Sequence, residues 1–170
     1  IRGRIVDDLY NTAYTLTRHL PGGLGIATIA ACTIFAAISG SSVATALTIG
    51  AVAIPQMIRF GYDPRFAYGL VAAGGTLGIL IPPSIVMVVY GAATETSVGK
   101  LFMAGIVPGI VLGLMLMSAI YVRARMLDLP RQPRAPTREI VTAGRESLWG
   151  LLLIVIILGG IYGGVFTPTE

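Results

Sequence analysis

Two short polar interruptions inside apolar segments hold the residues of this chain that are best suited to bind an ion or a small anion. The first is Ser-Gly-Ser-Ser at residues 39–42, and the second, residues 74–84, contains three glycines and two prolines. Inside a membrane, backbone that leaves the helical ladder is found only where protein buries it or where it lines a wet cavity. Each interruption therefore predicts part of a binding site.

The interruptions offer ligand atoms of two kinds. Unwound backbone frees carbonyl oxygens, which together with serine hydroxyls suit a hard monovalent cation such as Na⁺. Helix N-termini beside the unwound backbone present free amides, which together with hydroxyls suit a carboxylate. The predicted Na⁺ ligands are Ser39, Ser42, Gly78, Ile81 and Pro83, the last three mostly through carbonyls. The predicted substrate-binding residues are Gly40, Ser41, Ser42, Gly75 and Thr76.

Each interruption also has a structural explanation that involves no ligand. Small residues such as the serines of 39–42 let membrane helices pack closely. Glycine and proline are commoner in membrane helices than in soluble ones, so residues 74–84 also fit an ordinary kinked span. The density of glycine and proline favours a discontinuous helix, because proline removes amide donors and disfavours helix in the residue before it.

The composition predicts an all-α integral membrane protein. Hydrophobic residues make up 55% of the 170 residues, charged residues make up 12%, and the mean hydropathy is +0.82. Lys, Arg, Asp and Glu are absent from four runs, which are residues 20–58, 66–94, 101–122 and 147–169. A helix crosses roughly 30 Å of hydrocarbon with about 20 residues, so each of the last two runs predicts one transmembrane helix. The first two runs are longer than one ordinary span.

The positions of the basic residues predict the orientation. If the two middle apolar runs each cross the membrane once, residues 1–19, 59–65 and 123–146 lie on one side and hold 11 of the 12 Lys and Arg. That side is cytoplasmic by the positive-inside rule. Because the basic residues occupy loops between apolar runs, no nucleic-acid partner is predicted, and the lipid bilayer is the expected surrounding.

This orientation requires residues 20–58 to enter and leave on the same side. They form either a re-entrant helical hairpin with its tip at 39–42 or two short full spans. The tip is small and uncharged and has no flanking Trp or Tyr belt, which favours re-entry.

The remaining segments have simpler patterns. Residues 1–19 predict an amphipathic helix in the membrane interface, and residues 66–94 predict the discontinuous helix with its break at 74–84. Residues 123–146, rich in arginine and proline, predict a basic cytoplasmic linker between two membrane blocks.

Catalytic patterns are missing from the sequence. It contains no His-Glu-x-x-His, no intramembrane aspartate pair and no phosphate-binding Gly-x-x-x-x-Gly-Lys. We therefore expect a protein that is not an enzyme, holds no metal beyond Na⁺ and needs no cofactor.

Several stretches of the chain resemble the large membrane subunit, or permease, of tripartite ATP-independent periplasmic (TRAP) transporters. The matching stretches are residues 20–24, 36–46, 69–84, 94–102 and 166–170. The string Gly-Gly-Thr-Leu-Gly-Ile-Leu-Ile-Pro-Pro-Ser within them is the most specific.

The resemblance implies a Na⁺-coupled secondary transporter that imports organic anions, such as carboxylates or sialic-acid-like acids, across the cytoplasmic membrane of a bacterium or archaeon. It implies two partners, a small membrane subunit that is separate or fused and a periplasmic substrate-binding protein. It also implies an elevator-type fold of two inverted repeats, each a re-entrant hairpin followed by a discontinuous helix. Since only one such pair is found here, we expect a fragment of a longer chain. The alternatives are a passive ion or solute channel and a structural membrane scaffold.

Overall fold

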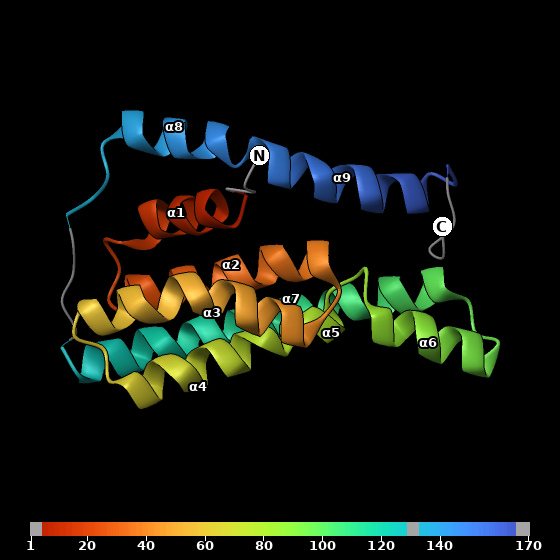
Figure 1. Ribbon diagram of the computed structural model, residues 1–170, viewed down its shortest axis with the longest axis horizontal. Helices are drawn as coiled ribbons and strands as arrows, with labels where there is room; N and C mark the ends of the chain where they lie inside the picture. The colour runs from red at the N-terminus through yellow and green to blue at the C-terminus, as the bar shows by residue number, and fades with distance from the viewer. Residues whose placement is uncertain (1–4, 129–132, 166–170) are drawn as a thin grey trace.

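The computed structural model describes residues 5–128 and 133–165, and within these ranges the regular structure is entirely helical. The helices are α1 (Ile5–Thr17), α2 (Gly23–Ser39), α3 (Ser42–Arg59), α4 (Pro64–Gly75), α5 (Leu77–Leu80), α6 (Ile85–Thr94), α7 (Val98–Met126), α8 (Thr137–Glu146) and α9 (Leu148–Tyr162). In Figure 1, α2, α3, α4 and α7 run side by side, while α1, α8 and α9 lie along one flank of this group.

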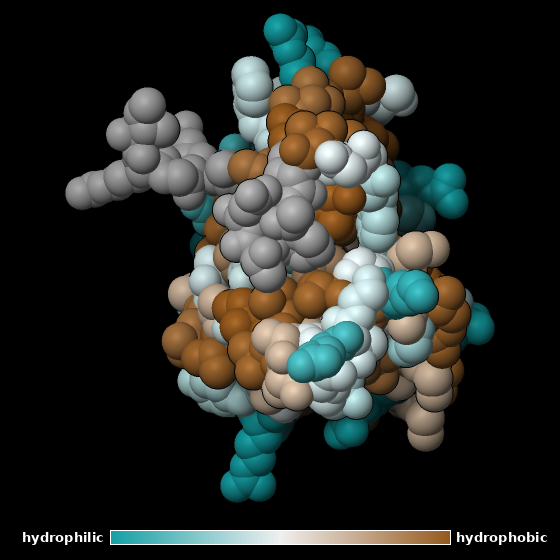
Figure 2. Space-filling model, turned by 90° about the vertical axis from the view of Figure 1, so that its right-hand side faces the viewer, coloured by the Kyte–Doolittle hydropathy of each residue, from teal (hydrophilic) through white to brown (hydrophobic). Residues whose placement is uncertain are grey.

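Three helical segments have the length and apolar composition of membrane spans, namely Ser42–Arg59, Pro64–Thr94 and Val98–Met126. Helices α8 and α9 together pass the same test but are bent by 49° at Ser147, and α2 is apolar but shorter. Large hydrophobic side chains are exposed along α6, α7 and α9, and brown apolar surface is extensive at the α6 and α9 end (Figure 2). These features are those of an all-helical, multi-pass integral membrane protein.

Helix α1 lies within the segment predicted to be amphipathic. Its apolar face is buried against α2, with Leu9, Tyr10 and Ala13 almost fully covered. The Tyr10 hydroxyl lies 3.5 Å from Thr28 Oγ1, and burial raises the pKa of Tyr10 to about 12. The face that the sequence pattern indicated is therefore used for packing within the protein.

The predicted linker contains more helix than expected. Residues 123–126 continue α7, and residues 137–146 form α8, while residues 129–132 lie outside the described residues. Proline favours the position just before or at a helix start, and Pro136 is the N-cap of α8 with Glu139 in its first turn. An amphipathic helix in this segment was masked in the sequence by its many arginines and prolines. Of the last predicted span, residues 166–169 also lie outside the described residues.

The predicted break in the discontinuous helix is shorter than expected. Gly74 and Gly75 remain in α4, and after Thr76 the chain forms one further helical turn, α5, before it unwinds at residues 81–84. Gly74 serves close packing instead, because a Cβ there would lie 2.8 Å from Cys32 Sγ. The prolines end the helix since they lack amide hydrogens.

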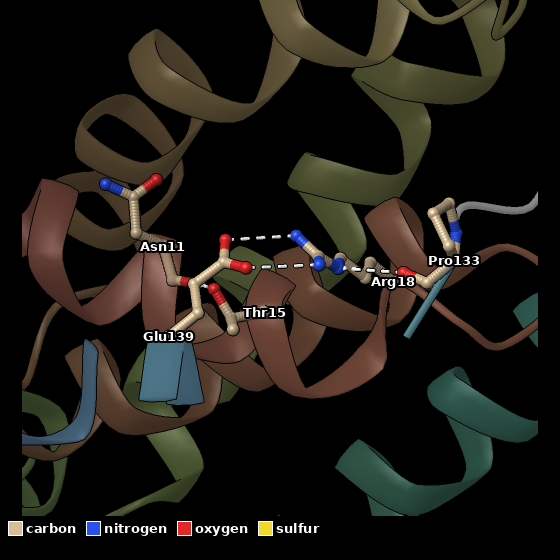
Figure 3. A network of polar contacts seen from close by, with 5 residues as sticks. All are labelled: Asn11, Thr15, Arg18, Pro133 and Glu139. Carbon is tan, nitrogen blue, oxygen red and sulfur yellow. Dashed lines mark hydrogen bonds and ion pairs between the residues drawn. The ribbon is translucent and has the colours of Figure 1, made fainter. Parts of the chain in front are cut away.

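Helices α1 and α8 are joined by polar contacts (Figure 3). The guanidinium of Arg18 donates from Nη1 and Nη2 to the two carboxylate oxygens of Glu139 at 3.0 and 3.1 Å, and its Nε donates to the Pro133 carbonyl at 3.0 Å. Nearby, the start of α2 touches the end of α7, because a Cβ on Gly22 would lie 2.6 Å from Ala124 Cβ.

Candidate functional site

The tip of the α2–α3 hairpin is a turn of two residues. Gly40 ends α2 in the left-handed conformation, with φ of 61°, and its N–H donates to the Ala36 carbonyl at 2.9 Å. Ser41 is extended and caps α3, because its hydroxyl accepts the Ala44 N–H at 3.4 Å. A left-handed glycine followed by a serine N-cap explains how the chain reverses within residues 39–42.

The hydroxyl groups of Ser39 and Thr45 form hydrogen bonds within this tip. Thr45 Oγ1 donates to the Ser41 carbonyl at 2.8 Å, and Ser39 Oγ lies 2.9 Å from Thr45 Oγ1. Either hydroxyl can donate in the second contact, because Ser39 Oγ also lies 3.4 Å from the Ser41 carbonyl oxygen. Thr45 is fully buried and was missed in the sequence, although its spacing of four residues from Ser41 is the spacing of a hydroxyl that bonds the preceding helical turn.

Ser42 differs from its neighbours in the tip. Its side chain is half-buried, and within the described residues its hydroxyl forms no hydrogen bond. Its amide belongs to the first turn of α3, where the helix has no carbonyl to offer. Ser42 therefore presents both a free hydroxyl and the positive end of a helix dipole.

The break leaves several backbone carbonyls available. Within the described residues, no N–H or O–H donates to the carbonyls of Gly78, Leu80, Ile81, Pro82 or Pro83. By contrast, the hydroxyl of Ser84, which is 1% exposed, donates to the Ile79 carbonyl at 2.9 Å. Three of the predicted Na⁺ ligands, Gly78, Ile81 and Pro83, thus keep carbonyl oxygens that can coordinate a cation.

The tip and the break touch through their backbones. The Gly40 carbonyl accepts the N–H of Ile85, the first residue of α6, at 3.1 Å. A Cβ on Gly40 would lie 2.5 Å from the Pro83 carbonyl oxygen, and a Cβ on Gly78 would lie 2.6 Å from the Ser41 carbonyl oxygen. Only glycine allows main chains to approach this closely.

The other predicted site residues lie around this contact. Gly75 packs against α3, where a Cβ would lie 2.8 Å from Ala46 Cβ and 3.1 Å from the Ser42 carbonyl oxygen. Ile81 faces α7, since a Cβ on Gly109 would lie 2.7 Å from its Cγ1. Thr76 points elsewhere: it is exposed, and its hydroxyl donates to the Ala73 carbonyl of its own helix at 2.6 Å. The structure therefore brings together the predicted residues except the Thr76 side chain.

The fold and this arrangement can be compared with known proteins. A family model described as "Tripartite ATP-independent periplasmic transporter, DctM component" matches residues 2–170. The chain belongs to this DctM family of TRAP transporters. The resemblance found in the sequence is thereby confirmed over nearly the whole chain.

Curated relatives of this DctM chain are transporter permease subunits rather than enzymes. It is 58% identical over 99% of its length to the C4-dicarboxylate TRAP transporter large permease protein DctM of Pseudomonas aeruginosa. It is 43% identical over 99% to an ectoine/5-hydroxyectoine TRAP transporter large permease protein of Ruegeria pomeroyi, and 38% identical over 99% to a sialic acid TRAP transporter permease protein of Haemophilus influenzae. The chain spans 39%, 40% and 27% of these relatives, respectively.

Proposed function

We propose that this chain supplies one side of the ion and substrate site of a Na⁺-coupled secondary transporter that imports organic anions. The observation that carries the proposal is the backbone contact between the tip and the break. It places the free Ser42 hydroxyl and the α3 N-terminus next to a segment whose carbonyls have no donors among the described residues. Carbonyls suit Na⁺, while the hydroxyl and helix N-terminus suit a carboxylate.

The α2–α3 hairpin is a re-entrant element in this proposal. Gly40 bonds to Ile85, and Gly78 contacts Ser41, so the tip meets the middle of the 31-residue span Pro64–Thr94. In Figure 1 the tip lies beside α5, while α6 extends further along the molecule. A hairpin that ends at the middle of a neighbouring span reaches only part of the way across the membrane.

The rest of the proposal concerns the complete transporter. Residues 1–19, 59–65 and 123–146 face the cytoplasm, and the protein lies in the cytoplasmic membrane of a bacterium or archaeon. A second, inverted hairpin and broken helix complete the site, and the two move together as an elevator. A small membrane subunit and a periplasmic substrate-binding protein are the partners. C4-dicarboxylates are the first anions to test, because they are named for the relative at 58% identity.

The test is uptake of radiolabelled succinate into proteoliposomes that contain the complete permease with its small subunit, with the binding protein added outside. We expect accumulation above equilibrium only with an inward Na⁺ gradient. Ser42→Ala should lower uptake by at least tenfold, because it removes the free hydroxyl. Ser118→Ala is the matched control, since the Ser118 hydroxyl donates to its own helix at Leu114, far along α7 from the tip.

Uptake that persists without a Na⁺ gradient would remove Na⁺ coupling from the proposal. Uptake that never exceeds equilibrium, or single-channel currents, would replace the carrier by a passive channel. Hairpin topology is tested separately by Ser41→Cys labelling with impermeant reagents from each side of the membrane. Labelling of a resting-state tip only from the periplasm, with flanks held in the cytoplasm, would establish two full spans instead of re-entry.

A further inference from the structure

Two apolar crevices meet near the C-terminal end of α7, at the opposite end of α3 and α4 from the tip. The first has a volume of about 750 Å³ and lies between α4 and α7, with Phe66, Leu70, Leu116 and Ile120 in its lining. The second, of about 650 Å³, is an open groove on the surface of α7 alone, with Val122 and Met126 in its lining. Both crevices are also lined by Ala119, Arg123 and Leu127.

Positive charge lies where the crevices join. The Arg123 guanidinium lies 5.0 Å from the centroid of the Phe66 ring, and this cation–π contact holds it at the shared rim. Arg65 lines the first crevice. In the part of the chain that the structure describes, neither arginine forms an ion pair.

Asp63, the acidic residue that lines the first crevice, already accepts hydrogen bonds from the backbone. The Asp63 carboxylate accepts the N–H groups of Arg65 and Phe66 at 2.8 and 3.3 Å and so caps α4. Its role is therefore to cap the start of α4. The two guanidinium groups remain available to an anion from outside the chain.

We propose that the crevices bind one anionic glycerophospholipid, with its phosphate at Arg123 and Arg65 and one acyl chain in each crevice. A diacyl lipid has a single phosphate that carries two apolar chains, and here two apolar crevices share one arginine, Arg123, in their linings. Arginine binds phosphate through paired N–H donors, and basic pockets between membrane helices are typical sites for anionic lipid headgroups. The proposal is independent of the ion and substrate site.

The test uses the complete permease, delipidated in detergent and examined by native mass spectrometry after addition of dioleoylphosphatidylglycerol or dioleoylphosphatidylcholine. We expect the anionic lipid to be retained in preference to phosphatidylcholine. Arg123→Gln should weaken retention of phosphatidylglycerol about tenfold, because it removes a charge-assisted contact. Arg125→Gln is the matched control: Arg125 lies over Tyr121, lines neither crevice and is two residues away on the same helix.

A second pair of variants tests the crevices without changing charge. Ala119 lines both of them, so Ala119→Phe should fill the shared space and lower retention of phosphatidylglycerol as Arg123→Gln does. Ala104→Phe adds the same ring to an exposed position of α7 outside the crevices and should have no effect.

Any of four results would overturn the proposal. Equal retention by Arg123→Gln and Arg125→Gln would show that Arg123 does not bind the headgroup. Full retention by Ala119→Phe, or competition by millimolar glycerol phosphate, would show that the crevices do not hold acyl chains. Retention of the anionic lipid no better than that of phosphatidylcholine would mean that this surface is covered by another part of the protein. The readout is lipid mass, so each result leaves the transport proposal standing.

Discussion

The hairpin tip and the break both interrupt apolar helices, but they treat their backbone polar groups differently. The tip is two residues long, and Ser39, Ser41 and Thr45 bond to one another or to nearby main chain. The break leaves the carbonyls of residues 80–83 without donors among the described residues. A closed turn that satisfies its own groups is rigid, while an open segment supplies ligand atoms. In the transport mechanism proposed above, the tip would position the site and the break would supply most of the cation ligands.

The largest effect is expected from Gly40→Ala. The new Cβ would lie 2.5 Å from the Pro83 carbonyl oxygen and would also have to tolerate a left-handed backbone. Ligand atoms displaced by about 1 Å lose function by on the order of a hundredfold, so we expect succinate uptake in proteoliposomes to fall by at least that factor. Gly61→Ala is the control, because Gly61 is also left-handed but a Cβ there meets nothing within 4 Å. Equal losses in the two variants would attribute the effect to backbone strain alone.

Gly78→Ala probes the same contact from the side of the break. The added Cβ would lie 2.6 Å from the Ser41 carbonyl oxygen, but φ at Gly78 is not positive, so the clash is not combined with left-handed backbone strain. We expect uptake to fall by about 30-fold and the Na⁺ concentration for half-maximal uptake to rise, because the break moves away from the tip. Gly99→Ala, whose Cβ meets only Ser97 Oγ at 3.9 Å, should leave both quantities unchanged. Normal Na⁺ dependence in Gly78→Ala would separate the tip from cation binding.

Thr45→Val tests whether the tip is held together by its own hydroxyls. Valine keeps the shape of the side chain but removes the groups that bond Ser39 and the Ser41 carbonyl. Loss of buried hydrogen bonds should lower the free energy of unfolding by about 1–2 kcal/mol, measured as a lower thermal midpoint of the purified permease. Thr33→Val removes a hydroxyl that bonds only its own helix, at Ile29, and should cost less. Equal midpoints in the two variants would mean that the tip does not depend on this network.

The smallest effect is expected from Thr76→Val, and it concerns binding rather than stability. The Thr76 side chain is exposed, and its hydroxyl bonds only the Ala73 carbonyl of its own helix among the described residues, so it could also bond a substrate. We expect the KM for succinate uptake to rise by about threefold, as the loss of one neutral hydrogen bond predicts, with no change in the thermal midpoint. Thr94→Val, at an exposed position on α6, is the control. A lower thermal midpoint in Thr76→Val would show that the break, like the tip, depends on its hydroxyl.

The sequence predicted the interruptions better than their details. The Ser-Gly-Ser-Ser string is a local signal, because a glycine and an N-cap serine specify a helix reversal by themselves, and the structure forms the turn there. The predicted extent of the break was wrong. Gly74 and Gly75 stay in α4, where their lack of a side chain lets the helix pack closely against residues that are distant in sequence. Helix α8 was missed because the arginines and prolines of residues 123–146 suggested a linker, and its ion pair with Arg18, 121 residues away, could not be read from the sequence. Thr45 was overlooked because a threonine in an apolar run looks like any other small helix residue.

The contact between Gly22 and Ala124 closes the region from α2 to α7 on itself. Its two ends meet, so the hairpin, the broken helix and α7 form a loop of chain that is closed in space. The Arg18–Glu139 ion pair joins the segments that precede and follow this loop. This geometry suits a circular permutation of the segment 22–124. A linker would join residue 124 to residue 22, and new ends would be opened between α6 and α7 at residues 95–97.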